Sequence, residues 1–162
     1  MPQVRLSLAR ALSWVQRLAR ARRATMDLSA PTIVFAPHPD DEVLGCGGTL
    51  ALKAARGARV KIVFMTDGGA SHARWIDAGA LTRIRHEEAI QAACRLGIRS
   101  SDLEFLDFPD HALGRHEAGA VARVLEILNE FSPVEIYVPH HGDRLADHVA
   151  TYRAVTEAAK SH

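Results

Sequence analysis

The sequence predicts a single α/β domain in which a parallel β-sheet carries helices on both faces. Four short apolar runs alternate with four segments of helical character along the chain. Polar clusters directly follow the first and the last of these runs, which is where an α/β protein builds a site at the carboxyl edge of its sheet. With 162 residues and 48% hydrophobic content, the chain is long enough for one domain with its own core.

The apolar runs are the expected strands, and they cover residues 32–35, 60–65, 103–106 and 134–138. Parallel strands need right-handed crossovers, so the sheet is expected to be Rossmann-like. We expect the strand order 3-2-1-4, which makes the first and fourth strands neighbours at the point where ligands bind. This order is inferred from the need to bring the two polar clusters together.

Helices are expected over Leu50–Arg56, Leu81–Leu96, His116–Phe131 and Val149–Lys160. Gly57 and Gly97 end the first two, since glycine readily forms a left-handed helix cap. A Gly-rich turn over residues 45–49 precedes the first helix but lacks both the G-x-G-x-x-G pattern and a phosphate-loop lysine. The glycines are therefore better explained by close packing at the start of a helix than by binding of a nucleotide. Cys46, which lies among them, is expected to be a small packed residue.

The first 25 residues differ in charge from the rest of the chain. Apolar residues at mainly helical spacing are interleaved there with six arginines and no acidic residue, which predicts a basic amphipathic helix. The remainder contains fourteen Lys and Arg against nineteen Asp and Glu, which does not suggest a nucleic-acid partner. We expect an extension over residues 1–26 and a domain over residues 27–162. For the extension, an appendage packed on the domain or an upstream start codon is favoured over a membrane-surface or partner-binding helix.

The cysteines and the apolar runs indicate the compartment. Cys46 and Cys94 provide neither a disulfide framework nor a C-x-x-C metal spacing, so a reducing cytoplasm is expected. No apolar run approaches the about 20 residues of a membrane-spanning helix, and the N-terminus lacks a continuous apolar signal region with a cleavage site.

The densest polar cluster covers residues 36–42 and includes three carboxylates and an imidazole within five residues. Each of these charges would cost roughly several kcal/mol if it were buried unpaired, so a cation is expected among them. Imidazole nitrogen with carboxylate oxygen suits zinc and, less selectively, other transition metals. Two ligands do not close such a site. The pair Asp147-His148, which follows the last expected strand, is the candidate source of a third.

Several short motifs stand at matching places in the expected fold: His38-Pro39-Asp40-Asp41-Glu42, the glycines of residues 45–48, Arg85-x-x-Glu88, Leu96-Gly97, Phe105 to Asp110, and Asp147-His148. Together they resemble the PIG-L or LmbE-like zinc-dependent N-acetyl-sugar deacetylases. The resemblance covers about residues 31–160. The His-Pro-Asp-Asp-Glu run is a specific signal in this context, whereas an Asp-His pair alone is a weak one.

The resemblance implies that His38, Asp41 and His148 bind one zinc ion per chain and that Asp40 stays free as the general base. The chemistry favours the same division. Zinc with three protein ligands keeps a position for water and lowers the pKa of that water, and a carboxylate outside the ligand set can then accept the proton. Iron(II) is an alternative, because a His-Asp-His site accepts metals according to their availability.

The resemblance also implies roles for neighbouring residues. Arg85 is expected to contact substrate, since its guanidinium suits a sugar hydroxyl or a phosphate. Asp147 is expected to orient the ring of His148. Glu42 is expected to bind backbone donors at the start of a helix.

The chain departs from the family pattern in two places. Many members have a histidine three residues before the ligand histidine, where this chain has Leu145. His141 is therefore the candidate imidazole for the oxyanion or the leaving amine, with His140 in reserve and a surface role as the open alternative. Members usually continue for some tens of residues beyond the helix after the Asp-His pair. This chain stops at His162, so the family's C-terminal region is expected to be shortened, in a natural short form, a fragment or a truncated product.

The expected function is hydrolysis of the N-acetyl group of a small N-acetylglucosamine-type sugar conjugate. One alternative is a metal-dependent phosphoesterase, for which Asp67 is the one good additional carboxylate. Another is a non-catalytic metal- or sugar-binding module or an inactive remnant. The presence of Asp40 argues against that reading, because a binding module needs no free base. The sequence specifies neither the particular sugar nor the oligomeric state.

Overall fold

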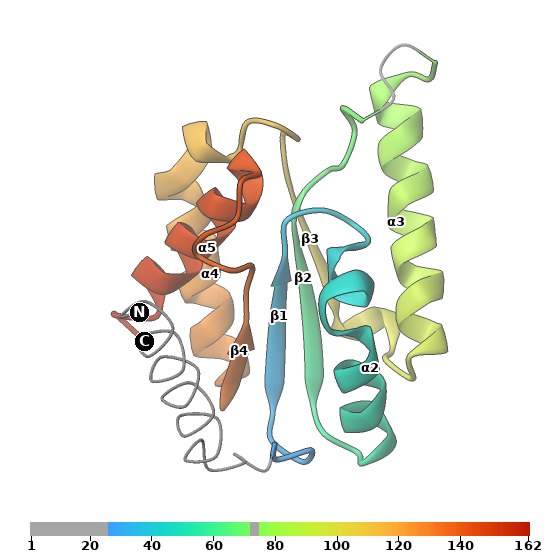
Figure 1. Cartoon of the computed structure of the whole chain (residues 1–162), viewed down its shortest axis with the longest axis vertical. Coiled ribbons are helices and arrows are strands. Elements are labelled where there is room, and N and C mark those ends of the chain that lie inside the picture. Colours follow the sequence, from blue (N-terminus) through green and yellow to red (C-terminus); the bar gives the residue numbers. More distant parts are fainter. Residues whose placement is uncertain (1–25, 72–74) are drawn as a thin grey trace, which may run out of the picture.

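The computed structural model describes residues 26–71 and 75–162 and confirms the α/β class (Figure 1). Four parallel strands form one sheet in the expected order β3-β2-β1-β4. The strands are β1 (Thr32–Ala36), β2 (Val60–Thr66), β3 (Leu103–Phe108) and β4 (Glu135–Tyr137). The helices are α2 (Asp41–Ala55), α3 (Ala78–Arg95), α4 (Glu117–Phe131) and α5 (Ala146–Ala158), with short 3-10 turns η1 (Ser100–Asp102) and η2 (Leu113–His116).

Helices cover both faces of the sheet, α2 and α3 on one face and α4 and α5 on the other (Figure 1). Successive side chains of a strand point to opposite faces. Ile33 and Phe35 of β1 accordingly pack in the core with α4 and α5, whereas Val34 and Ala36 pack in the core with α2 and α3. This burial on both faces accounts for the continuous apolar runs in the central strands.

Helix α2 begins at Asp41 and not at Leu50, so the glycines expected in a turn lie inside the helix. Asp41 and Glu42 occupy its first turn, where the positive end of the helix dipole favours carboxylates. The preceding residue, Asp40, has a φ of 136°. A sharp change of backbone direction at one residue therefore starts the helix directly after the loop.

Two other boundaries matter for the site. Helix α5 begins at Ala146 and not at Val149, which places Asp147 and His148 within its first turn. Strand β3 extends to Phe108, with an irregularity in its pairing with β2, and Asp107 there has a φ of 52°.

A buried lysine lies at the amino edge of the sheet. Lys53 of α2 is 0% exposed, and its Nζ lies 2.8 Å from Oε2 of Glu135 in β4. The same ammonium donates a hydrogen bond to the carbonyl of Asp27 at 2.7 Å. The hydrogen bond from Lys53 lowers the pKa of Glu135. These contacts join α2, β4 and the segment before β1.

The amphipathic helix expected within residues 1–25 lies outside the described residues, so the division into an extension over 1–26 and a domain over 27–162 stays a prediction. No helix within the described ranges combines the length and the apolar character that a membrane span requires.

Candidate metal centre

The loop after β1 holds His38 and Asp41 at the carboxyl edge of the sheet. The carbonyl of Pro37 accepts hydrogen bonds from the backbone N–H of Thr66 at 3.0 Å and from its hydroxyl at 2.8 Å. Prolines on both sides of His38 restrict the backbone further. The N–H of His38 itself donates to Oδ2 of Asp41 at 3.1 Å. The loop is therefore tied both to β2 and to the start of α2.

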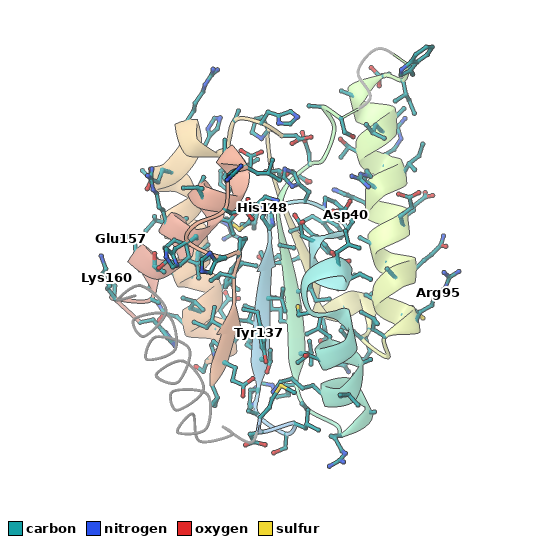
Figure 2. The ribbon with its side chains drawn as sticks, viewed as in Figure 1. Asp40, Arg95, Tyr137, His148, Glu157 and Lys160 are labelled. Atoms are coloured by element: carbon teal, nitrogen blue, oxygen red, sulfur yellow. The ribbon has the colours of Figure 1, made fainter. Side chains whose placement is uncertain are left out.

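The loop after β4 and the first turn of α5 supply the second set of side chains. Because β4 pairs with β1 in parallel, both strands end at the same edge of the sheet. Asp143 in this loop accepts the N–H of Leu145 at 3.0 Å, which shapes the turn into α5. In Figure 2, His148 and Asp40 lie at similar heights, and Tyr137 lies further from the carboxyl ends of the strands.

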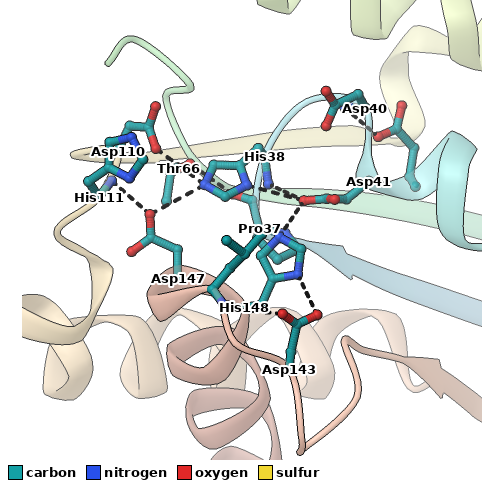
Figure 3. Close-up of polar contacts among 12 residues, drawn as sticks. Pro37, His38, Asp40, Asp41, Thr66, Asp110, His111, Asp143, Asp147 and His148 are labelled. Atoms are coloured by element: carbon teal, nitrogen blue, oxygen red, sulfur yellow. Dashed lines mark hydrogen bonds and ion pairs between the residues drawn. The ribbon is translucent and has the colours of Figure 1, made fainter. Parts of the chain in front are cut away.

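The structure brings His38, Asp41 and His148 together (Figure 3). Nδ1 of His38 lies 3.2 Å from Oδ2 of Asp41, and Nε2 of His148 lies 3.4 Å from the same oxygen. One ligand atom from each residue lies within 4.8 Å of the others. Two imidazole nitrogens and a carboxylate oxygen in such proximity could hold a single zinc or iron(II) ion.

The outward nitrogen of each imidazole meets a further carboxylate. Nε2 of His38 lies 3.2 Å from Oδ1 of Asp110 and 3.3 Å from Oδ2 of Asp147. Nδ1 of His148 lies 3.0 Å from Oδ2 of Asp143. Carboxylates placed in this way fix the orientation and tautomer of metal-binding imidazoles. The structure places the side chain of Asp147, expected beside His148, against His38 instead, and it is Asp143 that contacts His148.

Asp147 also joins α5 to the loop after β3. Its Oδ2 accepts the N–H of His111 at 2.7 Å, and its Oδ1 accepts the N–H of Leu113 at 3.1 Å. The same loop is held from the other side, where Oδ1 of Asp67 accepts the N–H of Asp110 at 3.1 Å. Asp67 thus positions the loop, and it belongs to neither group of possible metal ligands in the described part of the chain.

The centre carries more negative than positive charge. Four carboxylates, those of Asp41, Asp110, Asp143 and Asp147, contact two imidazoles, and within residues 26–71 and 75–162 no Lys or Arg forms an ion pair with any of the four. Burial alone lowers the pKa of His38, but the hydrogen bond to Asp41 and the charges of Asp110 and Asp41 raise it to about 9. A divalent cation bound here would replace the proton that the ring of His38 otherwise attracts.

A second group, His38 with Asp110 and Asp147, also has ligand atoms within 4.8 Å of one another. It shares His38 with the first group, and Asp147 already accepts two backbone N–H groups. The two carboxylates are therefore better explained as partners of the outward nitrogen of His38 than as a separate ion site.

Asp40 lies apart from the three candidate ligands. Its side chain is 46% exposed, and its Oδ2 lies 3.4 Å from a terminal nitrogen of Arg85 in α3. The backbone N–H of Asp40 donates to Oε2 of Glu42 at 3.0 Å, a contact with a backbone donor of the kind expected for Glu42. Burial raises the pKa of Glu42. Neighbouring carboxylates thus have different surroundings: Asp41 faces imidazoles, whereas Asp40 faces Arg85 and solvent.

His140 and His141 are both exposed. Their ring centroids lie 4.2 Å apart, and that of His141 lies 6.0 Å from the ring of Tyr152 in α5. In the part of the chain that the structure describes, neither histidine belongs to a group of possible metal ligands or contacts His38, Asp41 or His148.

A cavity of about 380 Å³ opens beside Asp41 and His148. Strands β1 and β4 and the start of α2 form its walls, which include Leu44, Cys46 and Tyr137. Such a mainly apolar hollow next to a polar centre is typical of a small-molecule site. Burial and the charge of Glu42 raise the pKa of Cys46 to about 11, as expected for a packed cysteine.

Asp143 and Asp110 are two residues of the centre for which no role was expected from the sequence. Both carried a signal, because each lies just beyond the end of an expected strand, at the edge where the ligands were sought. Their positions in the sequence did not show which imidazole nitrogen each carboxylate would contact.

Known proteins match most of this chain. A family model described as PIG-L, GlcNAc-PI de-N-acetylase, matches residues 33–159. A 1D-myo-inositol 2-acetamido-2-deoxy-alpha-D-glucopyranoside deacetylase from Mycobacterium sp. (strain KMS) is 33% identical over 157 residues, covering 80% of this chain and 50% of that protein.

Solved structures show the same fold. The N,N'-diacetylchitobiose deacetylase of Pyrococcus horikoshii superimposes with a TM-score of 0.72 at 25% identity, covering 90% of this chain and 58% of that one. The 4-carboxy-2-hydroxymuconate hydratase of Pseudomonas putida KT2440 superimposes with a TM-score of 0.70 at 25% identity, covering 79% of this chain and 55% of that one. Because both a hydratase and deacetylases have this fold, the fold alone does not identify the reaction, and the chemistry of the site decides it.

The chain spans between 50% and 68% of the length of the first curated relatives that it matches. The shared part contains the whole group of candidate ligands, because residues 33–159 include His38, Asp41 and His148.

Proposed function

Because the chain belongs to the PIG-L family, we propose that it is a metal-dependent deacetylase acting on an N-acetylglucosamine-type sugar conjugate. The observation that carries the proposal is the meeting of His38, Asp41 and His148 at the sheet edge. The carboxylate of Asp40, the residue before Asp41, stays outside this group and faces Arg85 and solvent. A centre that only stored a metal would need no free carboxylate in that place.

His38, Asp41 and His148 are the residues that would hold one divalent ion, zinc first and iron(II) as the alternative. When bound, the ion supplies Lewis acidity to the acetyl carbonyl and lowers the pKa of a nearby water. Asp147 keeps the ring of His38 in place through a hydrogen bond, and Asp143 does the same for the ring of His148. The family likeness and this donor set support the metal.

Asp40 is the proposed general base. Its exposed carboxylate can accept a proton from the attacking water, and a positioned base of this kind accelerates a reaction by typically about 10²–10⁴-fold. Arg85, which lies against Asp40, is the proposed substrate contact through a sugar hydroxyl or a phosphate.

His141 is the candidate for protonating the leaving amine, with His140 in reserve. This assignment is supported by the family resemblance and by its place in the loop that carries Asp143. Comparing His141→Ala with His140→Ala tests it. A loss of kcat in the His141→Ala variant alone supports His141. If both variants keep the kcat of the unsubstituted protein, neither histidine takes part in the reaction.

The substrate is proposed to carry a 2-acetamido sugar, since the mycobacterial and archaeal relatives are both named for such compounds. The same names favour amide hydrolysis over phosphoester hydrolysis. The archaeal relative acts on a disaccharide and the mycobacterial one on an inositol conjugate, so the group attached to the acetamido sugar is to be found by screening.

The decisive experiment combines metal content with turnover. We expect about one zinc or iron per chain by elemental mass spectrometry, and release of acetate from N-acetylglucosamine conjugates. Asp40→Asn should retain the metal and the fold while its turnover falls by about 10²–10⁴-fold. Asp102→Asn, at the opposite edge of the sheet, is the matched control and should behave like the unsubstituted protein.

Two results would contradict the proposal. Unchanged turnover in Asp40→Asn would remove Asp40 as the base. Failure of the folded protein to retain zinc or iron(II) supplied in solution would remove the metal centre itself.

A further inference from the structure

Glu42 is a buried carboxylate to which the proposed reaction assigns no role. Its side chain is 1% exposed in the first turn of α2. Its Oε2 accepts the backbone N–H of Asp40 at 3.0 Å, while its Oε1 has no hydrogen-bond partner in the described part of the chain. A buried carboxylate with so few donors is costly to the folded state, so its role is expected to lie in the contact that it does make.

That contact acts on an unusual piece of backbone. Asp40 has φ 136° and ψ −28°, a combination that residues with a Cβ atom rarely adopt. Its carbonyl accepts the N–H groups of Val43 at 3.1 Å and Leu44 at 3.0 Å, which begin α2. The helix thus holds the carbonyl side of Asp40, and Glu42 holds its N–H side. A strained conformation persists where the surroundings determine it from both sides.

The conformation separates two adjacent carboxylates. Asp41 faces the imidazoles of His38 and His148, whereas Asp40 stands away from that group, as Figure 3 shows. The direction of the Cα–Cβ bond of Asp40 follows from its φ and ψ. A relaxed backbone at this residue would therefore point the carboxylate elsewhere and remove it from Arg85.

We propose that Glu42 is a positioning residue: its carboxylate accepts the N–H of Asp40, holds the positive-φ conformation and thereby directs the Asp40 side chain towards Arg85, the proposed substrate contact. The inference rests on the proposed function in that Asp40 is taken as the general base. Its claim about the backbone of Asp40 does not depend on any activity.

Three substitutions separate positioning from simple filling of space. Glu42→Gln retains the length and a carbonyl oxygen that can accept the same N–H. Glu42→Met retains the volume without an acceptor of comparable strength. Glu42→Asp retains the charge but shortens the reach, and it carries the same expectation as Glu42→Met should that variant fail to fold. Glu117→Met, an exposed first-turn position of α4, is the matched control.

We expect Glu42→Met to lower kcat by about 10- to 100-fold, since small displacements of a catalytic group cost this much. KM should stay within about two-fold and metal content should be unchanged, because neither Arg85 nor the ligands are altered. Glu42→Gln should stay within a few-fold of the unsubstituted protein. A loss of kcat as large in Glu42→Gln as in Glu42→Met would overturn the proposal, and so would a loss of metal that accompanies the fall in kcat.

Hydrogen exchange at the amide of Asp40, followed by NMR on the same proteins, tests the backbone claim without substrate. This amide should be protected in the unsubstituted protein and in Glu42→Gln, and should exchange at least about 10-fold faster in Glu42→Met. Unchanged exchange would overturn the positioning role even in an active deacetylase. Faster exchange in a protein that shows no deacetylase activity would support the positioning of Asp40 and contradict the proposed function alone.

Discussion

The two edges of the sheet both bury charged groups, but they treat them differently. At the amino edge, the ammonium of Lys53 meets the carboxylate of Glu135 and the carbonyl of Asp27, so opposite charges are matched within the chain. At the carboxyl edge, the carboxylates of Asp41, Asp110, Asp143 and Asp147 outnumber the two imidazoles that they contact.

This difference in charge balance distinguishes the structural ion pair at the amino edge from the candidate ligand site at the carboxyl edge. Breaking a matched buried pair removes stability, because the remaining charge keeps its desolvation cost. A cluster with excess negative charge is instead completed by a cation from solution, and its ligands then couple metal binding to proton release. Substitutions at the amino edge should therefore affect folding, and those at the carboxyl edge should affect metal binding.

The largest expected effect is loss of the metal in His148→Ala. The variant removes one of three protein ligands, so we expect no retained zinc or iron after gel filtration, measured by elemental mass spectrometry, and no detectable turnover. His140→Ala, an exposed histidine on the preceding loop, serves as the control and should retain about one ion per chain. Full metal retention in His148→Ala would show that the ion binds elsewhere.

At the amino edge, Lys53→Met should lower the free energy of unfolding by about 1–2 kcal/mol, because the carboxylate of Glu135, which is partly exposed, and the carbonyl of Asp27 both lose their charged donor. Urea denaturation measures the change, and Lys160→Met at the exposed end of the chain should stay within about 0.5 kcal/mol. Metal content per folded chain should not change. If Lys53→Met loses metal without losing stability, the two edges are not independent.

A smaller effect is expected for Asp143→Asn. The amide can still contact His148 but lacks the negative charge that makes the imidazole a better ligand, so metal affinity should fall by about 10- to 100-fold. Competition with a fluorescent zinc chelator measures this change, with Asp102→Asn as the control. An unaltered affinity would mean that Asp143 shapes the loop and does not tune the ligand.

The pH dependence of the metal-free protein should be the mildest of these effects. The pKa of His38 is raised from 6.5 to about 9 in the folded chain, so its contribution to stability is fully present below pH 6.5 and is lost as the pH rises through about 9. Urea midpoints of chelator-treated protein should fall over this range. Zinc-loaded protein should not show this fall, and identical profiles for the two forms would place the metal away from His38.

Much of the fold was predictable because it follows from local pattern. The apolar runs at 32–35 and 60–65 identified the central strands, since a strand buried on both faces is apolar throughout. The start of α2 was not predictable in the same way. Three glycines between Gly45 and Gly48 suggest a turn, and only the packing of the helix against β1 and β2 shows that they are helical.

The sequence by itself determined which chemistry is available: two histidines and several carboxylates after two strands that end at one edge, in motifs that resemble one family. The tertiary structure alone decided how these groups are divided. It turned Asp147 towards His38 and placed Asp143 against His148. It also separated Asp40 from Asp41 through a strained backbone that Glu42 contacts. The physical reason is that the direction of a side chain depends on φ, ψ and packing, which residue spacing does not specify.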